Sequence, residues 1–91
     1  MSRQLREVWY AGHVQGDGFR YTVATLARSW EVAGYVRNLP DGRVHVVVEG
    51  DAQELDELLE AVAQRMQGYI RDVRQDRRPA TGQFVGFEVR S

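Results

Sequence analysis

Residues 12–20 are the stretch from which the rest of the chain can be interpreted, and they read Gly12-His13-Val14-Gln15-Gly16-Asp17-Gly18-Phe19-Arg20. Glycine adopts backbone conformations that other residues avoid, so Gly16 and Gly18 allow consecutive amide N–H groups to turn toward one point. The segment that follows has a helical pattern, and the first turn of a helix presents unpaired N–H groups and a positive dipole end. Arg20 adds a guanidinium at the same place. The stretch predicts a strand-to-helix loop that binds an anion such as phosphate.

A strand is predicted before this loop and a helix after it. Residues 7–14 alternate, and one face of the strand carries Val8, Tyr10, Gly12 and Val14. Residues 21–33 place apolar side chains three and four positions apart, as the buried stripe of a helix does. These side chains are Val23, Leu26, Ala27, Trp30 and Ala33. We expect Gly34 to end the helix in a left-handed conformation.

The second half of the chain continues with alternating strands and one more helix. A short strand over 34–38 leads into the turn Leu39-Pro40-Asp41-Gly42 and a strand over 43–49. Asp51 and Glu54 have the spacing of a capping box, and we expect their helix to end at Gly68. A strand over 69–76 has irregular alternation, which predicts a bulge or an early end. Residues 84–89 form a last short strand at an edge.

This order of elements predicts an α+β fold, a ferredoxin-like βαββαβ sandwich over a single domain of residues 1–91. The single apolar stripe of each helix places both helices on one face of an antiparallel sheet, with a short extra C-terminal strand. The crossover rule and the hairpin make the strands over 7–14 and 43–49 central neighbours.

Composition narrows the classes of function. The chain has 12 basic and 13 acidic residues and a net charge of −1, which argues against a general nucleic-acid binder. It has no cysteine, so disulfides, thiolate nucleophiles and cysteine-based zinc sites are excluded. Neither a signal peptide nor a membrane-spanning run is present, so we expect a cytoplasmic protein that does not bind membranes.

Residues 12–20, together with Asn38-Leu39-Pro40-Asp41-Gly42-Arg43-Val44 and Gly86-Phe87-Glu88-Val89-Arg90, resemble acylphosphatase over nearly the whole chain. The resemblance implies hydrolysis of the carboxyl-phosphate bond of small acyl phosphates. It implies that Arg20 binds the phosphate, that Asn38 orients the attacking water, and that loop amides assist. These amides belong to Gln15, Gly16, Asp17, Gly18, Phe19 and Arg20. We expect a monomer. We also expect that the reaction needs neither a metal nor another cofactor, because an acyl phosphate has a good leaving group.

Asp17 is a departure from the resemblance, since the family commonly has valine there. A carboxylate about 8 Å from a phosphate charge would weaken binding by roughly 2 kcal/mol at an effective dielectric near 20. Solvent screening reduces this penalty if the side chain points outward, and an outward side chain that caps the loop is the interpretation we favour.

Two other functions remain as alternatives. Asp17 motivates a non-catalytic binder of phosphorylated metabolites. Trp9, on the exposed face of its strand, motivates an RNA-interacting ferredoxin-like module, although residues 45–49 lack the aromatic and basic side chains of such a platform.

His13 and His45 fall on polar strand faces, where a solvated sheet surface is a better interpretation than a metal pair. The arginines over 71–78 alternate with Asp72 and Asp76 and indicate a mixed, solvated edge.

Overall fold

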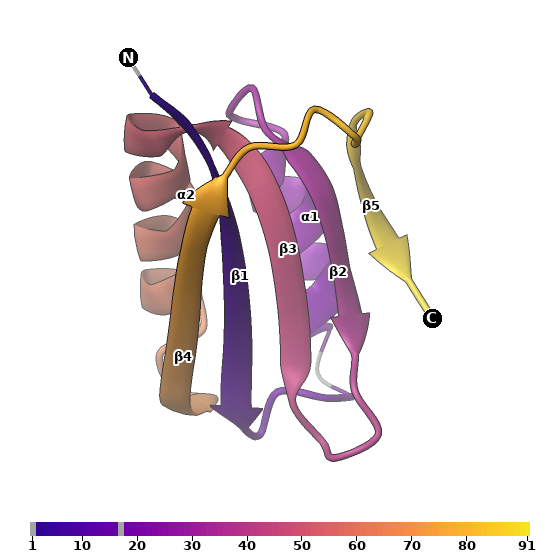
Figure 1. The fold of residues 1–91 in the computed structure, drawn as a ribbon. Coiled ribbons are helices and arrows are strands. Elements are labelled where there is room, and N and C mark those ends of the chain that lie inside the picture. Colours follow the sequence, from indigo (N-terminus) through magenta and orange to yellow (C-terminus); the bar gives the residue numbers. More distant parts are fainter. Residues whose placement is uncertain (1, 17) are drawn as a thin grey trace.

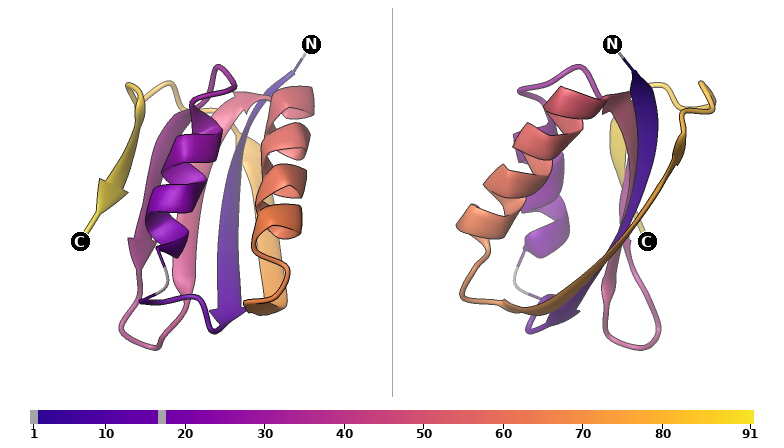
Figure 2. Two further views of the ribbon diagram at one scale, coloured as in Figure 1. Left: turned by 180° about the vertical axis from the view of Figure 1, so that it is seen from behind. Right: turned by 60° about the vertical axis from the view of Figure 1, so that its left-hand side comes forward.

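The computed structural model describes residues 2–16 and 18–91, which form a five-stranded sheet with two helices on one face (Figures 1 and 2). The spatial order of the strands is β4-β1-β3-β2-β5. The elements along the chain are β1 (Arg3–Gly12), α1 (Phe19–Ala27), β2 (Ala33–Asn38), β3 (Val44–Asp51), α2 (Ala52–Arg65), β4 (Ile70–Pro79) and β5 (Phe87–Arg90). The predicted ferredoxin-like fold and its extra C-terminal strand are confirmed. The prediction about the side chain of Asp17 lies outside the described residues.

The pairing of the strands positions the proposed site. Both β1 and β2 pair antiparallel with β3, so β1 and β2 run in the same direction and their C-terminal ends lie at the same end of the sheet (Figure 1). The loop after Gly12 and the end of β2 at Asn38 therefore lie at the same end of the sheet. The expectation of a wholly antiparallel sheet is wrong at one place, because β5 pairs parallel with β2.

The core lies between the helices and the sheet. The predicted inward face of β1 is confirmed, since Val8 and Tyr10 are buried, and burial raises the pKa of Tyr10 far above its ordinary value. From α2 the buried stripe consists of Leu55, Leu58 and Val62. Figure 2 shows both helices packed on this face of the sheet.

The first helix is shorter than predicted. It ends at Ala27, and the next residues form a tighter turn in which Ser29 N donates to Leu26 O and Trp30 N donates to Ala27 O. This turn continues the apolar stripe without continuing the helix, which is why the spacing of Trp30 was misleading. Gly34 is not the stop, because it lies inside β2.

The predicted capping box is only half formed. Asp51 is the N-cap of α2, and its carboxylate accepts a hydrogen bond from Gln53 N at 3.0 Å. Glu54 does not return a bond to Asp51. Its side chain instead accepts from Glu31 N at 2.9 Å, so it ties the turn after α1 to the start of α2.

β1 and β4 are each longer than predicted, and β5 is shorter. β1 begins at Arg3, which pairs with Asp51 of β3. Arg6, only 2% exposed, is buried and contacts Asp56 on α2 and Gln75 on β4. The predicted bulge in β4 is confirmed, since Ala11 pairs with Asp72 and Gly12 with Ile70. β4 runs on to Pro79, whereas the last strand starts only at Phe87.

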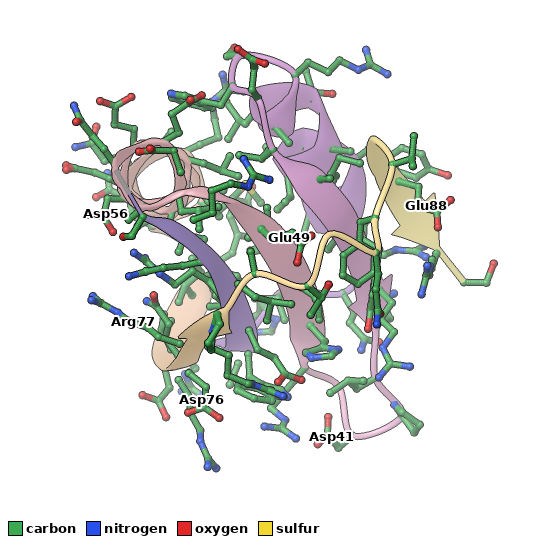
Figure 3. The ribbon with its side chains drawn as sticks, turned by 45° about the horizontal axis from the view of Figure 1, so that its top comes forward. Asp41, Glu49, Asp56, Asp76, Arg77 and Glu88 are labelled. Carbon is green, nitrogen blue, oxygen red and sulfur yellow. The ribbon has the colours of Figure 1, made fainter. Side chains whose placement is uncertain are left out.

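A buried carboxylate holds the connection between β4 and β5 on the face opposite the helices. Glu49 of β3 is 1% exposed and accepts hydrogen bonds from Thr81 N, Thr81 Oγ1 and Gly82 N at 2.8, 2.9 and 2.7 Å. Figure 3 shows the connecting chain passing over Glu49 on its way to β5. Burial alone would raise the pKa of Glu49, but the bonds from Thr81 and Gly82 outweigh burial and hold the pKa below its ordinary value.

His45 does not lie on a solvated surface as predicted, and it is not a neighbour of His13. It is 3% exposed and pairs across the sheet with Trp9, whose ring stacks on the imidazole with centroids 5.3 Å apart. Arg37 Nε donates to Nδ1 at 3.1 Å, so Nε2 carries the proton and donates to Glu7 Oε2 at 2.7 Å. Burial, with Arg37 and Arg43 nearby, lowers the pKa of His45 despite this contact with Glu7.

Within the described residues, neither helix has the length and apolar character needed to cross a membrane.

Candidate active site

A cleft of about 200 Å³ opens where the loop after β1, the start of α1 and the end of β2 meet. Its lining brings together residues that are far apart in the sequence. The described residues that line it are Val14, Gly16, Gly18, Phe19, Arg20, Tyr21 and Asn38. Arg20 of α1 and Asn38 of β2 therefore border the same space. This arrangement follows from the parallel directions of β1 and β2.

The glycine loop has the backbone geometry that the sequence predicts. Gly16 and Gly18 have φ angles of 85° and 74°, in the left-handed region that favours glycine. Gly18 is the N-cap of α1, no side chain among residues 2–16 and 18–91 caps the helix, and its first turn contains no acidic residue. With respect to the described side chains, the first N–H groups of α1 and its positive dipole end are available to an anion.

Arg20 lies in the first turn of α1 and is held from outside the loop. Its Nη1 donates to the carbonyl of Arg90 at 2.8 Å, at the end of β5. A guanidinium has five N–H donors, so this bond orients the group and leaves donors for a ligand. The C-terminal strand was predicted from its sequence, but its contact with Arg20 was not.

Asn38 is half-buried at the end of β2, where its side chain lines the cleft. Its Oδ1 is buried and has no hydrogen-bond partner among the described residues. An unpaired buried acceptor costs about 1–3 kcal/mol, so its retention next to a cleft is typical of a group that serves a ligand or water.

The side chain of Gln15 has a contact that the sequence interpretation missed. Predicted only as a loop amide, Gln15 also donates from Nε2 to Leu39 O at 2.8 Å and to Arg43 O at 2.9 Å. Both carbonyls belong to the hairpin between β2 and β3, directly after Asn38. Gln15 thus joins the glycine loop to the segment that carries Asn38. No local pattern indicates such a contact, because it depends on the packing of two distant turns.

Two residues that line the cleft, Val14 and Tyr21, were not predicted as site residues, and Tyr21 is the one of the two with an exposed side chain. Its position directly after Arg20 was the available signal, since adjacent residues of a first helical turn can border the same opening. Phe19, in contrast, is 1% exposed and packs against Tyr10, so its side chain belongs to the core while its backbone belongs to the loop. Among residues 2–16 and 18–91, no three His, Asp or Glu side chains gather closely enough to hold a metal ion.

Comparison with known proteins agrees with this geometry. The family model described as Acylphosphatase matches residues 6–89. An acylphosphatase of Nocardia farcinica is 42% identical over 90% of this chain and 83% of its own length. One from Rubrobacter xylanophilus is 42% identical over 98% of this chain and 84% of its own length. The crystal structure of acylphosphatase from Bacillus subtilis superposes with a TM-score of 0.87 at 28% identity, covering 97% of this chain and 99% of that one. The chain belongs to the acylphosphatase family and is a hydrolase of that type.

Proposed function

We propose that the cleft hydrolyses small acyl phosphates, with Arg20 and the loop amides binding the phosphate and Asn38 positioning the attacking water. One observation carries the proposal. Arg20 from α1 and Asn38 from β2 line the same cleft as the two left-handed glycines of the loop.

The chemistry of the substrate explains why so few groups suffice. In an acyl phosphate a carboxylate is joined to phosphorus through oxygen, and this carboxylate leaves readily. Water attacks phosphorus, the bond from phosphorus to the acyl oxygen breaks, and the carboxylate departs with the electron pair. The water becomes part of inorganic phosphate, and its proton passes to the phosphate or to solvent. Positioning and charge stabilisation carry the reaction.

The phosphate would sit against the start of α1. The amide N–H groups of residues 15–20 and the positive end of α1 favour a dianion at this point. Gly18 lacks a Cβ, and its left-handed conformation supports this arrangement. The guanidinium of Arg20 would donate two parallel bonds to phosphate oxygens while Nη1 keeps its bond to Arg90 O. Charge that develops on these oxygens is then met by donors already in place.

Asn38 would act on the water. Its Oδ1, which lacks a partner among the described residues, accepts a hydrogen bond from the water and fixes its direction of approach. Gln15 supports this role indirectly, because its two bonds to the hairpin set the position of Asn38 relative to the loop.

The experiment measures steady-state hydrolysis of benzoyl phosphate by the wild type and by Arg20→Ala, with and without a chelator. Loss of a charge-stabilising donor should lower kcat by about 10²–10³-fold. The chelator should leave the wild-type rate unchanged. The matched control is Arg28→Ala, at the exposed C-cap of the same helix, which should retain the wild-type rate.

Two results would contradict the proposal. Full activity of Arg20→Ala would show that Arg20 does not bind the phosphate of the substrate. Binding of inorganic phosphate without any hydrolysis by the wild type would instead support the alternative, a non-catalytic binder of phosphorylated metabolites.

A further inference from the structure

Tyr21 has an unusual position for a large side chain. It is 64% exposed, although it lies at the start of α1 next to Arg20. The described chain exposes four large apolar or aromatic side chains, and Tyr21 is the one of them that lines the cleft. None of the hydrogen bonds between described side chains involves its hydroxyl. The ring is therefore available for contact with a bound molecule.

The other cleft residues cannot provide an apolar surface for a ligand. Val14 and Phe19 are each 1% exposed, and their side chains face the core. Gly16 and Gly18 have no side chain. Arg20 and Asn38 are polar, and the proposed reaction assigns them to the phosphate and the water. Among the described lining residues, Tyr21 is thus the side chain left for the remainder of the substrate.

The direction of the reaction points to the same assignment. In hydrolysis at phosphorus the leaving oxygen departs on the side opposite the attacking water. The water is assigned to Asn38 on β2, so the acyl group extends away from β2. Tyr21 belongs to α1, a different wall of the cleft.

Resting on the proposed function, we infer that Tyr21 contacts the acyl group and gives this protein a preference for acyl phosphates with apolar, above all aromatic, acyl groups. An aromatic ring prefers to pack against another ring or an apolar surface, and a phenyl group offers more of this contact than a methyl group. The cleft is small and open, so this selection comes from one wall and is modest in size.

The test uses two analogues that cannot be hydrolysed, benzoylphosphonate and acetylphosphonate, and measures both Kd values by titration calorimetry. In the wild type the benzoyl analogue should bind more tightly. In Tyr21→Ala the Kd of acetylphosphonate divided by the Kd of benzoylphosphonate should fall by about fivefold, the size expected of one aromatic contact. Tyr21→Phe should keep the wild-type ratio, because the ring and not the hydroxyl makes the contact.

The matched control is Tyr69→Ala, which removes another exposed tyrosine that does not line the cleft, and it should keep the wild-type ratio. The same four proteins are then assayed with benzoyl phosphate and acetyl phosphate. An equal ratio of Kd values in the wild type and Tyr21→Ala overturns the inference, whatever the hydrolysis rates. If Tyr21→Ala changes the Kd ratio but the wild type hydrolyses neither substrate, the contact between Tyr21 and the acyl group is supported and the proposed function is refuted.

Discussion

Replacing Glu49 by glutamine tests how the C-terminal part of the chain is held on the sheet. The carboxylate accepts three hydrogen bonds from the segment between β4 and β5, two at Oε2 and one at Oε1. Glutamine has nearly the same shape but only one carbonyl oxygen, and its NH₂ group is a donor. If that oxygen takes the place of Oε2, the bonds from Thr81 survive and the NH₂ group faces Gly82 N–H. One charge-assisted bond is then lost.

The size of the effect follows mainly from this lost bond, because the two bonds from Thr81 survive as weaker, neutral bonds. A hydrogen bond to a charged group contributes about 1.5–3 kcal/mol, so Glu49→Gln should lower the free energy of unfolding by about that amount. In a domain of 60–100 residues each kcal/mol moves Tm by about 4–8 °C, so the variant should melt about 10 °C below the wild type at pH 7.

The effect should depend on pH with a definite sign. The folded-state pKa of Glu49 is lowered, so the folded protein binds fewer protons at this group than the unfolded chain does. The stabilisation is therefore fully present above the unfolded pKa of about 4.3 and is lost as the pH falls through the folded pKa. Below that pH the carboxyl is neutral in both states, and the wild type and the variant should melt close together.

Thermal unfolding followed by circular dichroism from pH 7 to pH 3 gives the measurement. The matched control is Glu60→Gln, the same chemical change at an exposed position of α2, which should move Tm by no more than about 2 °C. A Glu49→Gln variant as stable as Glu60→Gln at pH 7 would refute the argument. A difference that persists unchanged to pH 3 would refute its electrostatic part.

Three further predictions concern the cleft and the opposite face. Asn38→Ala should lower kcat for benzoyl phosphate more than it raises KM, because its role is to position water; an unchanged kcat would exclude that role. Gln15→Met should also lower kcat, and it should lower stability by about 1–2 kcal/mol in chemical denaturation, since two bonds to the hairpin are lost. His45→Gln should flatten the dependence of Tm on pH between 7 and 5, where the wild type loses stability because unfolding lets a buried neutral imidazole take up a proton. Parallel Tm profiles of wild type and variant would count against this interpretation.

Much of the fold could be predicted because its local signals agree. The alternation of Val8 and Tyr10, the apolar stripe of α2 and the turn over 39–42 each indicate one kind of element, and the structure contains all three. The glycine loop was equally clear, because left-handed backbone needs glycine and the next residues form a helix.

The errors lie where tertiary contacts override local pattern. Arg6 and His45 carry polar side chains, yet both are buried, because Asp56 and Gln75 contact the one and Arg37 and Glu7 contact the other. A sequence pattern treats such residues as solvent-facing. The site shows the same limit, since the loop and Arg20 were readable locally, whereas the bond from Gln15 to the hairpin was not.

The bond between Arg20 and Arg90 ties the guanidinium to the part of the sheet with the least support. β5 has four residues, lies at an edge, and pairs with β2, from which residues 39–86 separate it in the sequence. Short elements near a chain terminus, with few contacts on one side, are the usual first places of local unfolding. Transient opening of β5 would release Arg20 while the rest of the molecule stays folded. Hydrogen exchange at β5 amides would then report how often the phosphate site loses its orienting contact, on a timescale separate from global unfolding.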